Sequence, residues 1–295
     1  MRILIYLTTV SVYLILFSNH IWAIDREDTY IFAASACPPW ETATLEKYAN
    51  KIADACKNDV EVFTSSLKKA LDIPNANIVK VLNDQATYDG LKQNLKKFAD
   101  SVPVHSRVVM LLNFHGALTT IGSADNKSEE EVFILWTNEK PFSELAALDT
   151  NQWITTIELR DQLDKIRAKE IVIIIDSCHS GAALHDIFYH GRDEDWDGRE
   201  AVITSSKPEQ YAYFTVEGSN GVFTLELSES IDSGSSDLNT AYEQTYKGTV
   251  EYLNSDYVQE KCSEMFWQLL KKKQRCVQTP VKYDPSNLLP TIKLN

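Results

Sequence analysis

Basic residues are scarce in this chain of 295 residues, which has 29 lysines and arginines against 42 aspartates and glutamates, for a formal net charge of −13. This balance argues against nucleic acid or an anionic membrane surface as the main partner, because both carry negative charge themselves. The hydrophobic content of 44% is enough to bury a sizeable core. We therefore expect one soluble globular domain, acting as a monomer.

Long apolar runs are lacking beyond the N-terminus. Arg2 precedes an apolar run over Ile3–Phe17, which is shorter than the roughly 20 residues needed to span a bilayer, and Ala23 follows as a plausible cleavage edge. This pattern predicts a signal peptide over 1–23 and a single domain over 24–295. The large residue three positions before the cut leaves an uncleaved anchor as the alternative. We expect no integral membrane segment in the mature chain, and a protein that is secreted or held in the lumen of the secretory or endolysosomal pathway.

Cysteines are few and odd in number. In an oxidising compartment, four of the five can form two disulfides and the fifth stays a free thiol. The simplest connectivity joins Cys37 to Cys56 and Cys262 to Cys276, and leaves Cys178 free. The alternative is that all five are small buried hydrophobic residues.

Repeats and long linkers are absent, and apolar segments alternate with segments of helical periodicity. This alternation predicts an α/β fold, with a mostly parallel central sheet and helices on both faces. Thr87 or Asp89 is expected to cap the second helix. The expected strands span 29–35, 77–82, 107–114, 131–136, 170–176 and 199–206, with a last extended piece at 278–284, and the expected helices span 41–71, 87–99, 155–168, 221–231, 237–254 and 262–273.

A polar loop is expected over 119–130, between two of these strands. It contains the sequon Asn126-Lys127-Ser128, which is an acceptor sequence for N-glycosylation in exported proteins. Its hydrophilic surroundings fit an exposed glycan at Asn126.

Two strands end on reactive residues. The strand over 107–114 leads into His115 and Gly116, and the strand over 170–176 leads into Ser-Cys-His-Ser-Gly, with Cys178 as the cysteine. The carboxyl ends of parallel strands meet at one edge of a sheet, where catalytic groups gather. Taken singly, each residue is more often an ordinary loop residue, but their convergence predicts a nucleophile with its base.

A cysteine nucleophile needs a base that removes its proton, and His115 is the candidate. His179 is the rival, but adjacent residues point to opposite sides of an extended chain, which favours His115. Gly116 permits close approach of a scissile carbonyl, and the backbone N–H groups of Gly116 and Cys178 are candidates for the oxyanion hole.

Several segments resemble the caspase-like cysteine peptidases of family C14 in clan CD, specifically the metacaspase-type branch. They are the His-Gly pair, ELRDQLDKIRAKEIVIIIDSCHSG, ITSSKPEQYAY, GVFTLEL and QTPV, spread over about 29–281. The resemblance implies a caspase-like three-layer sandwich, endopeptidase activity on protein or peptide substrates, a dyad of His115 and Cys178, and no cofactor for the chemistry. Asn113 and Phe114 stand where the branch usually has Ser-Gly, so the pocket wall differs here.

Asp176 lies two residues before Cys178 on the strand, so both side chains are expected to face the cleft. A carboxylate there suits a cationic substrate side chain, which predicts cleavage after arginine or lysine. The metacaspase resemblance implies the same role for this aspartate, and Asn113 is expected to line the same pocket. The alternative is that Asp176 caps the following turn.

An acidic loop after the cysteine strand makes Ca²⁺ a candidate ligand. Asp193, Asp195, Asp197 and Gly198 match the start of an EF-hand-like loop, but Thr204 occupies its twelfth position and Glu200 would have to substitute. The family's own calcium pattern after the His-Gly pair is replaced by KSEEEVFILW. The alternative is a solvated acidic loop without metal.

Other classes of function fit less well. A serine hydrolase acting through Ser180 would need glycine two residues earlier, where Cys178 stands. The short segment between Gly181 and Ala201 favours a single uncut chain. The remaining alternative is a secreted binding protein on an inactive peptidase fold.

Overall fold

A computed structural model describes residues 24, 28–38, 46–123, 126–136, 151–184, 195–270 and 274–294. The predicted signal peptide and Asp193 lie outside these ranges.

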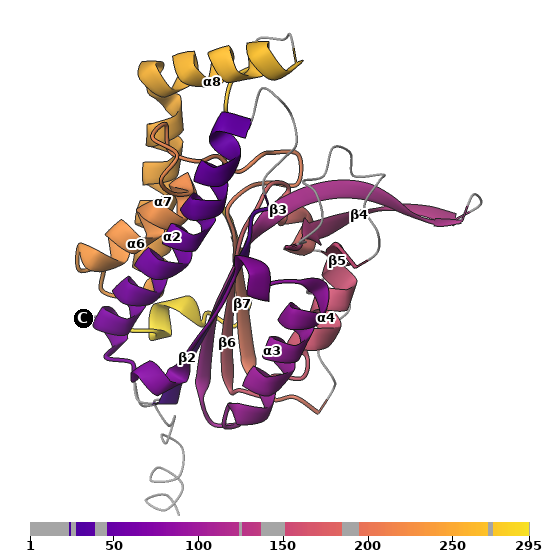
Figure 1. Cartoon of the computed structure of the whole chain (residues 1–295). Helices are drawn as coiled ribbons and strands as arrows, with labels where there is room; N and C mark the ends of the chain where they lie inside the picture. The colour runs from indigo at the N-terminus through magenta and orange to yellow at the C-terminus, as the bar shows by residue number, and fades with distance from the viewer. Residues whose placement is uncertain are drawn as a thin grey trace, which may run out of the picture.

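An eight-stranded sheet forms the centre of the molecule, and its main path runs in the order β2-β1-β3-β6-β7-β8 (Figure 1). The first five strands of this path are parallel and β8 is antiparallel, while β4 and β5 extend from β3 as antiparallel partners. The strands are β1 (Thr29–Ala36), β2 (Ile78–Leu82), β3 (Arg107–Ser123), β4 (Asn126–Ile134), β5 (Trp153–Thr155), β6 (Glu170–Asp176), β7 (Arg199–Thr204) and β8 (Val281–Tyr283).

Helices cover both faces of this sheet, as the alternation of segments predicts. Every residue of β6 is buried, because a parallel strand between two helical layers has no solvent face. Ile173 packs in the core with α3 and α4, whereas Ile174 packs in the core with α2, α6 and α7. The helices are α2 (Glu46–Leu71), α3 (Tyr88–Ser101), α4 (Thr156–Leu163), α6 (Val222–Asp232), α7 (Leu238–Asn254) and α8 (Asp256–Leu270). The predicted three-layer arrangement is confirmed, with a mostly parallel sheet between two layers of helices.

Side-chain caps explain where two helices begin. Thr87, and not Asp89, caps α3 by accepting a hydrogen bond from the backbone N–H of Gly90. Thr155 and Glu158 form a capping box at the start of α4. That helix ends at Leu163, earlier than the periodicity suggests.

The structure corrects the prediction of a polar loop over 119–130. Most of it forms a β-hairpin, because β3 continues to Ser123 and β4 starts at Asn126. Backbone N–H and C=O groups pair across antiparallel strands whatever the side chains, so this polar sequence still forms a ladder. Figure 1 shows the hairpin extending away from the sheet. Glycosylation of Asn126 stays a prediction.

The structure contains two disulfides with the expected pairing. Cys37–Cys56 joins the end of β1 to α2, with 6.2 Å between the Cα atoms, and Cys262–Cys276 joins α8 to the segment before β8, with 5.9 Å. Cys178 is a free thiol.

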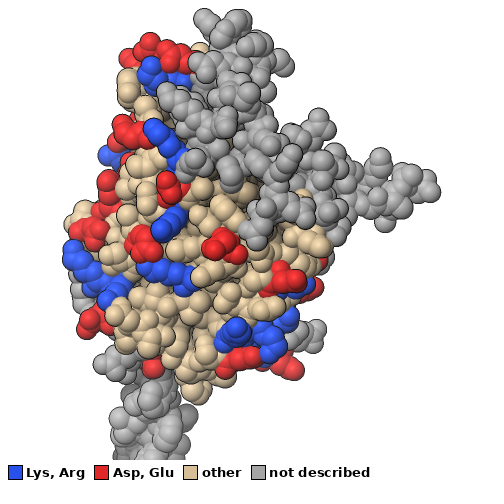
Figure 2. Space-filling model, in the orientation of Figure 1, with Lys and Arg blue, Asp and Glu red and all other residues tan. Residues whose placement is uncertain are grey.

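Charges of both signs lie on the face of the molecule seen in Figure 1. Figure 2 shows lysines and arginines interspersed with aspartates and glutamates on the face seen in Figure 1. Among the residues that the structure describes, no helix has the length and apolar character needed to cross a membrane.

Candidate active site

The reactive residues that follow β3 and β6 meet at one edge of the sheet. Asn113 on β3 lies beside Asp176 on β6 in the parallel register, so the two strands end together. His115 and Cys178 line the same small pocket as these two residues. The pocket measures about 20 Å³, which is room for about one water molecule. Its lining is completed by Asp59, Phe114, Ser177, Ala212, Tyr213, Phe214 and Gly221.

Gly116 brings the two strand ends into direct contact. A Cβ atom at this position would lie 2.0 Å from the Cys178 carbonyl oxygen and 2.8 Å from Ser177 Oγ. Only glycine fits here without moving the backbone that carries the cysteine. The backbones of Gly116 and Cys178 therefore adjoin, as an oxyanion hole formed from both would require, although that role stays a prediction.

The His115 ring is held from the side of β1. It forms a hydrogen bond with the backbone of Pro38, and because proline has no N–H, the imidazole N–H donates to the Pro38 carbonyl. Burial lowers the pKa of His115 to about 4, against the opposing effect of this bond. The imidazole is therefore neutral at neutral pH, which is the form that accepts a proton.

Cys178 lies just past the end of β6, and its thiol contacts the segment after β7 that contains Ala212. Sγ contacts the Ala212 carbonyl oxygen at 3.7 Å. Burial raises the pKa of the Cys178 thiol to about 11. The resting pair is therefore a neutral thiol and a neutral imidazole, and attack requires proton transfer to a base together with release of Ala212.

His179, the rival base, is occupied elsewhere. Its backbone is left-handed, with φ of 62°, and its Nδ1 lies 2.7 Å from the carbonyl oxygen of Pro208. A carbonyl only accepts, so Nδ1 carries the proton. The ring also meets Tyr211 edge-on, with 5.1 Å between centroids. This arrangement favours His115 as the base.

The remaining residues of the cysteine motif fasten the turn to the end of β7. Ser180 Oγ accepts a hydrogen bond from the Ser206 backbone N–H at 3.1 Å, and Ser206 Oγ donates to the Ser177 carbonyl at 3.1 Å. The Ser180 side chain is fully buried in this cluster. Ser180 thus supports the loop that presents Cys178.

Asp176 lies in the pocket with Cys178, on the face that the two-residue spacing predicts. Its carboxylate accepts a hydrogen bond of 2.6 Å from Thr224 Oγ1 at the start of α6, and a further one from Ser205. Burial raises the pKa of Asp176. These bonds tie Asp176 to α6 and to the end of β7, which does not support the alternative that it caps the following turn.

Asp59 is a pocket residue that the sequence analysis missed. It is fully buried on α2, where its carboxylate accepts from Asn113 Nδ2 at 2.8 Å, Asn220 Nδ2 at 2.9 Å and the Gly221 backbone N–H at 3.0 Å. Burial, followed by the nearby charge of Asp176, raises the pKa of Asp59 to about 8. The sequence feature that could have indicated Asp59 is an aspartate within the buried stripe of an amphipathic helix.

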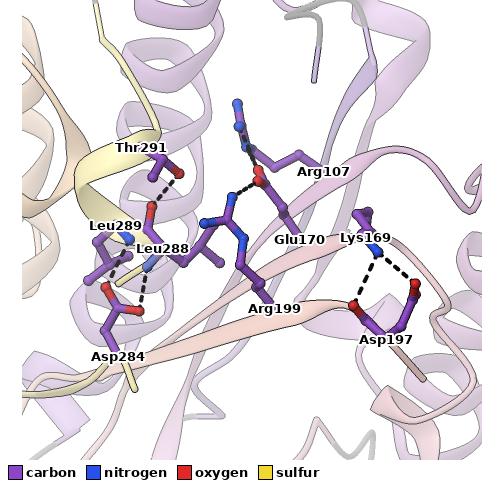
Figure 3. Close-up of polar contacts among 9 residues, drawn as sticks. All are labelled: Arg107, Lys169, Glu170, Asp197, Arg199, Asp284, Leu288, Leu289 and Thr291. Carbon is purple, nitrogen blue, oxygen red and sulfur yellow. Dashed lines mark hydrogen bonds and ion pairs between the residues drawn. The ribbon is translucent and has the colours of Figure 1, made fainter. Parts of the chain in front are cut away.

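The calcium hypothesis loses one proposed ligand. Glu200 does not substitute for the missing twelfth ligand, because it is buried and paired with Arg160 at 2.6 Å. Asp197 binds Lys169 Nζ at 2.8 Å, as Figure 3 shows, so this carboxylate already has a cationic partner. Across the described ranges, no three His, Cys, Asp or Glu side chains cluster as metal ligands. Asp193 lies outside them, so the Ca²⁺ site stays an untested prediction.

The chain belongs to the caspase domain family, peptidase C14, whose model matches residues 45–280. This confirms the family to which the cysteine motif points, which is a family of cysteine peptidases. Among solved structures, the chain is similar to a Geobacter sulfurreducens protein, with a TM-score of 0.55 and 16% identity over 90% of this chain and 99% of that one. It is also similar to caspase-1 from Spodoptera frugiperda, with a TM-score of 0.53 and 11% identity over 91% and 93%. At these identities the likeness concerns the fold. No curated protein matches the chain significantly.

Proposed function

We propose that the protein is a secreted cysteine endopeptidase of the metacaspase type, which cleaves peptide bonds after arginine or lysine. The observation that carries this proposal is the convergence of His115, Cys178 and Asp176 in one pocket at the carboxyl edge of the sheet. Family membership supports the reaction class, and the buried carboxylates support the substrate preference.

In this mechanism the Cys178 sulfur attacks the scissile carbonyl while His115 takes the thiol proton. The ring nitrogen opposite the bond to Pro38 is the acceptor. The oxyanion is held by the backbone N–H groups of Gly116 and Cys178. His115 then gives the proton to the leaving amine, the peptide C–N bond breaks, and the acyl group stays on Cys178 as a thioester. A water molecule, deprotonated by His115, attacks this thioester. Its hydrolysis releases the acid product and regenerates the thiol.

A cationic side chain enters the pocket toward Asp176, which meets it with a charge-assisted hydrogen bond. Burial raises the pKa of Asp176, and a bound guanidinium or ammonium would favour its ionised form. The resting pocket, of about 20 Å³, is too small for such a side chain. We expect the segment with Ala212, Tyr213 and Phe214 to move when a substrate binds, which would also free the Cys178 thiol from the Ala212 carbonyl.

Two features support secretion, the predicted signal over 1–23 and the two disulfides, since disulfides persist in oxidising compartments. Whether that signal is cleaved does not affect the site. The competing proposal is a binding protein on an inactive peptidase fold. It does not explain why a candidate base and a candidate nucleophile line one pocket together with Asp59 and Asp176.

A peptide panel that varies only the residue before the scissile bond tests the proposal, using wild type, Cys178→Ala and Asp176→Asn. We expect cleavage after Arg and Lys by wild type, and a fall of at least about 10³-fold in kcat for Cys178→Ala because the nucleophile is lost. Asp176→Asn should lower kcat/KM for Arg substrates far more than for their uncharged citrulline counterparts.

Different failures have different meanings. Binding of peptides by wild type without cleavage would establish the binding-protein alternative. Cleavage after Asp in preference to Arg would leave the enzyme class intact and remove the assignment of Asp176.

A further inference from the structure

The Cys37–Cys56 disulfide lies next to the group that holds the candidate base. Cys37 immediately precedes Pro38, and the Pro38 carbonyl accepts the hydrogen bond from His115. Both Cys37 and Pro38 are buried. The covalent link is therefore one residue away from the acceptor that orients the imidazole.

The sheet itself stops holding the chain just before this point. The parallel register of β1 with β3 ends with Ala36 beside Phe114. From His115 onward, β3 pairs with β4 instead, with His115 opposite Ile134. Cys37 and Pro38 thus extend past the last ladder pair of β1, where the disulfide supplies a covalent anchor.

Helix α2, which carries the other half of the disulfide, is fixed by independent contacts. Asp59, three residues after Cys56, is bonded to Asn113, Asn220 and Gly221. The next turns of α2 pack in the core against β1 and β3. Because the helix is held without the disulfide, the segment that depends most on this link is the one at Pro38.

We propose that the Cys37–Cys56 disulfide is a positioning element of the active site, which holds the Pro38 carbonyl against His115 and so fixes the imidazole for proton transfer from Cys178. A hydrogen bond from one ring nitrogen decides which tautomer is present, and leaves the opposite nitrogen as the acceptor. A misplacement of a reacting group by about 1 Å lowers the rate by roughly 100-fold. The catalytic meaning of this inference rests on the proposed function.

The second disulfide provides a matched control. Cys262–Cys276 spans 14 residues and Cys37–Cys56 spans 19, so the chain-entropy model gives the two disulfides similar loop-closure contributions to stability. Cys262 and Cys276 pack with Leu253, Val258 and Tyr213, in a cluster that contains neither Pro38 nor His115. Loss of this second link therefore tests stability without releasing the acceptor of His115.

The experiment compares the double variants Cys37→Ala/Cys56→Ala and Cys262→Ala/Cys276→Ala in the full chain. We expect the first pair to lower kcat by about 10- to 100-fold with KM changed less than about threefold, because the base is displaced but the substrate pocket is kept. Water admitted to the ring also relieves the burial that lowers the pKa of His115 to about 4, so the acid limb of kcat/KM should move up in pH. The Cys262→Ala/Cys276→Ala variant should keep the acid limb of kcat/KM at the wild-type pH.

A readout that needs no substrate separates this inference from the proposed function. The rate at which iodoacetamide alkylates Cys178, measured against pH, reports the thiol and its base even if no peptide is cleaved. If wild type cleaves nothing, the proposed function fails, while a changed alkylation profile in the Cys37→Ala/Cys56→Ala variant alone would still support the positioning role.

The inference is wrong if the Cys37→Ala/Cys56→Ala variant melts cooperatively and keeps both the wild-type kcat and the wild-type alkylation profile. Should that variant not fold, a glycine inserted between Cys37 and Pro38 keeps the disulfide but separates it from the carbonyl. The same loss of kcat is then expected, and wild-type kinetics of the insertion variant would overturn the proposal.

Discussion

At the scale of single residues, burial decides the charge states of the candidate site. It lowers the pKa of His115 to about 4 and raises that of the Cys178 thiol to about 11, so both groups are uncharged at neutral pH. Burial also raises the pKa of both pocket carboxyls, Asp59 and Asp176. A cation that binds in the pocket would favour the ionised form of both carboxyls.

The raised pKa of Asp59 predicts the direction in which the stability of the protein changes with pH. Its pKa is about 8 in the folded protein against 3.8 for a free side chain, so between these pH values the folded state holds a proton that the unfolded state lacks. This contribution to stability is present below about pH 4 and is lost as the pH rises through about 8. Urea unfolding should therefore show wild type losing stability from pH 5 to pH 8, and Asp59→Asn losing less over the same interval. Exposed Asp84, changed to Asn, is the control and should keep the wild-type slope; an unchanged slope in Asp59→Asn would contradict the raised pKa.

The sequence predicts the residues that follow strands better than those that lie on helices. His115, Asp176 and Cys178 were found because parallel strands end at one edge, a rule that needs no coordinates. Asp59 reaches the same pocket only through the packing of α2 on the sheet. Its bonds to Asn113 and Gly221 join residues far apart in sequence, which no local pattern encodes.

At the scale of elements, the change of partner by β3 shapes the site. Up to Phe114 it is a buried parallel strand, and from His115 it forms a hairpin with β4. The apolar part was predictable from its continuous hydrophobic run, whereas the polar part resembled a loop because strand pairing through the backbone leaves no trace in side-chain polarity.

Gly116, at this change of partner, is expected to tolerate no side chain. Gly116→Ala places a methyl group 2.0 Å from the Cys178 carbonyl oxygen, so the backbone must shift, at a cost of roughly 1–3 kcal/mol, and the nucleophile must move with it. The measurements are urea unfolding and the rate of Cys178 alkylation. Gly248→Ala in α7 is the matched comparison, because its added methyl meets only the flexible end of Glu226 and helix propensity favours alanine by about 1 kcal/mol. Wild-type alkylation in Gly116→Ala would show that the two strand ends are less tightly joined than we describe.

At the scale of the whole molecule, the two ends of the parallel strands hold different kinds of residues. The carboxyl edge holds the candidate catalytic groups. The amino edge holds a row of charges in register across three strands, Arg107 on β3, Glu170 on β6 and Arg199 on β7 (Figure 3). Arg107 and Glu170 are buried, with 2.6 Å between Arg107 Nη2 and Glu170 Oε2, and Arg199 pairs with the other oxygen.

This separation predicts a variant that loses stability without losing chemistry. Glu170→Ala leaves the buried Arg107 without its counter-ion, and breaking a buried pair in this way costs about 3–5 kcal/mol. We expect a lower urea midpoint, together with wild-type kcat, KM and acid limb at temperatures where the variant is folded, because Glu170 lies at the opposite end of β6 from Cys178. The exposed pair Lys96–Asp100 provides the contrast, since Asp100→Asn should change stability by less than about 1 kcal/mol. A fall in kcat of the folded Glu170→Ala variant would mean that strain at the amino edge reaches the nucleophile along β6, and that the two ends of the sheet are not independent.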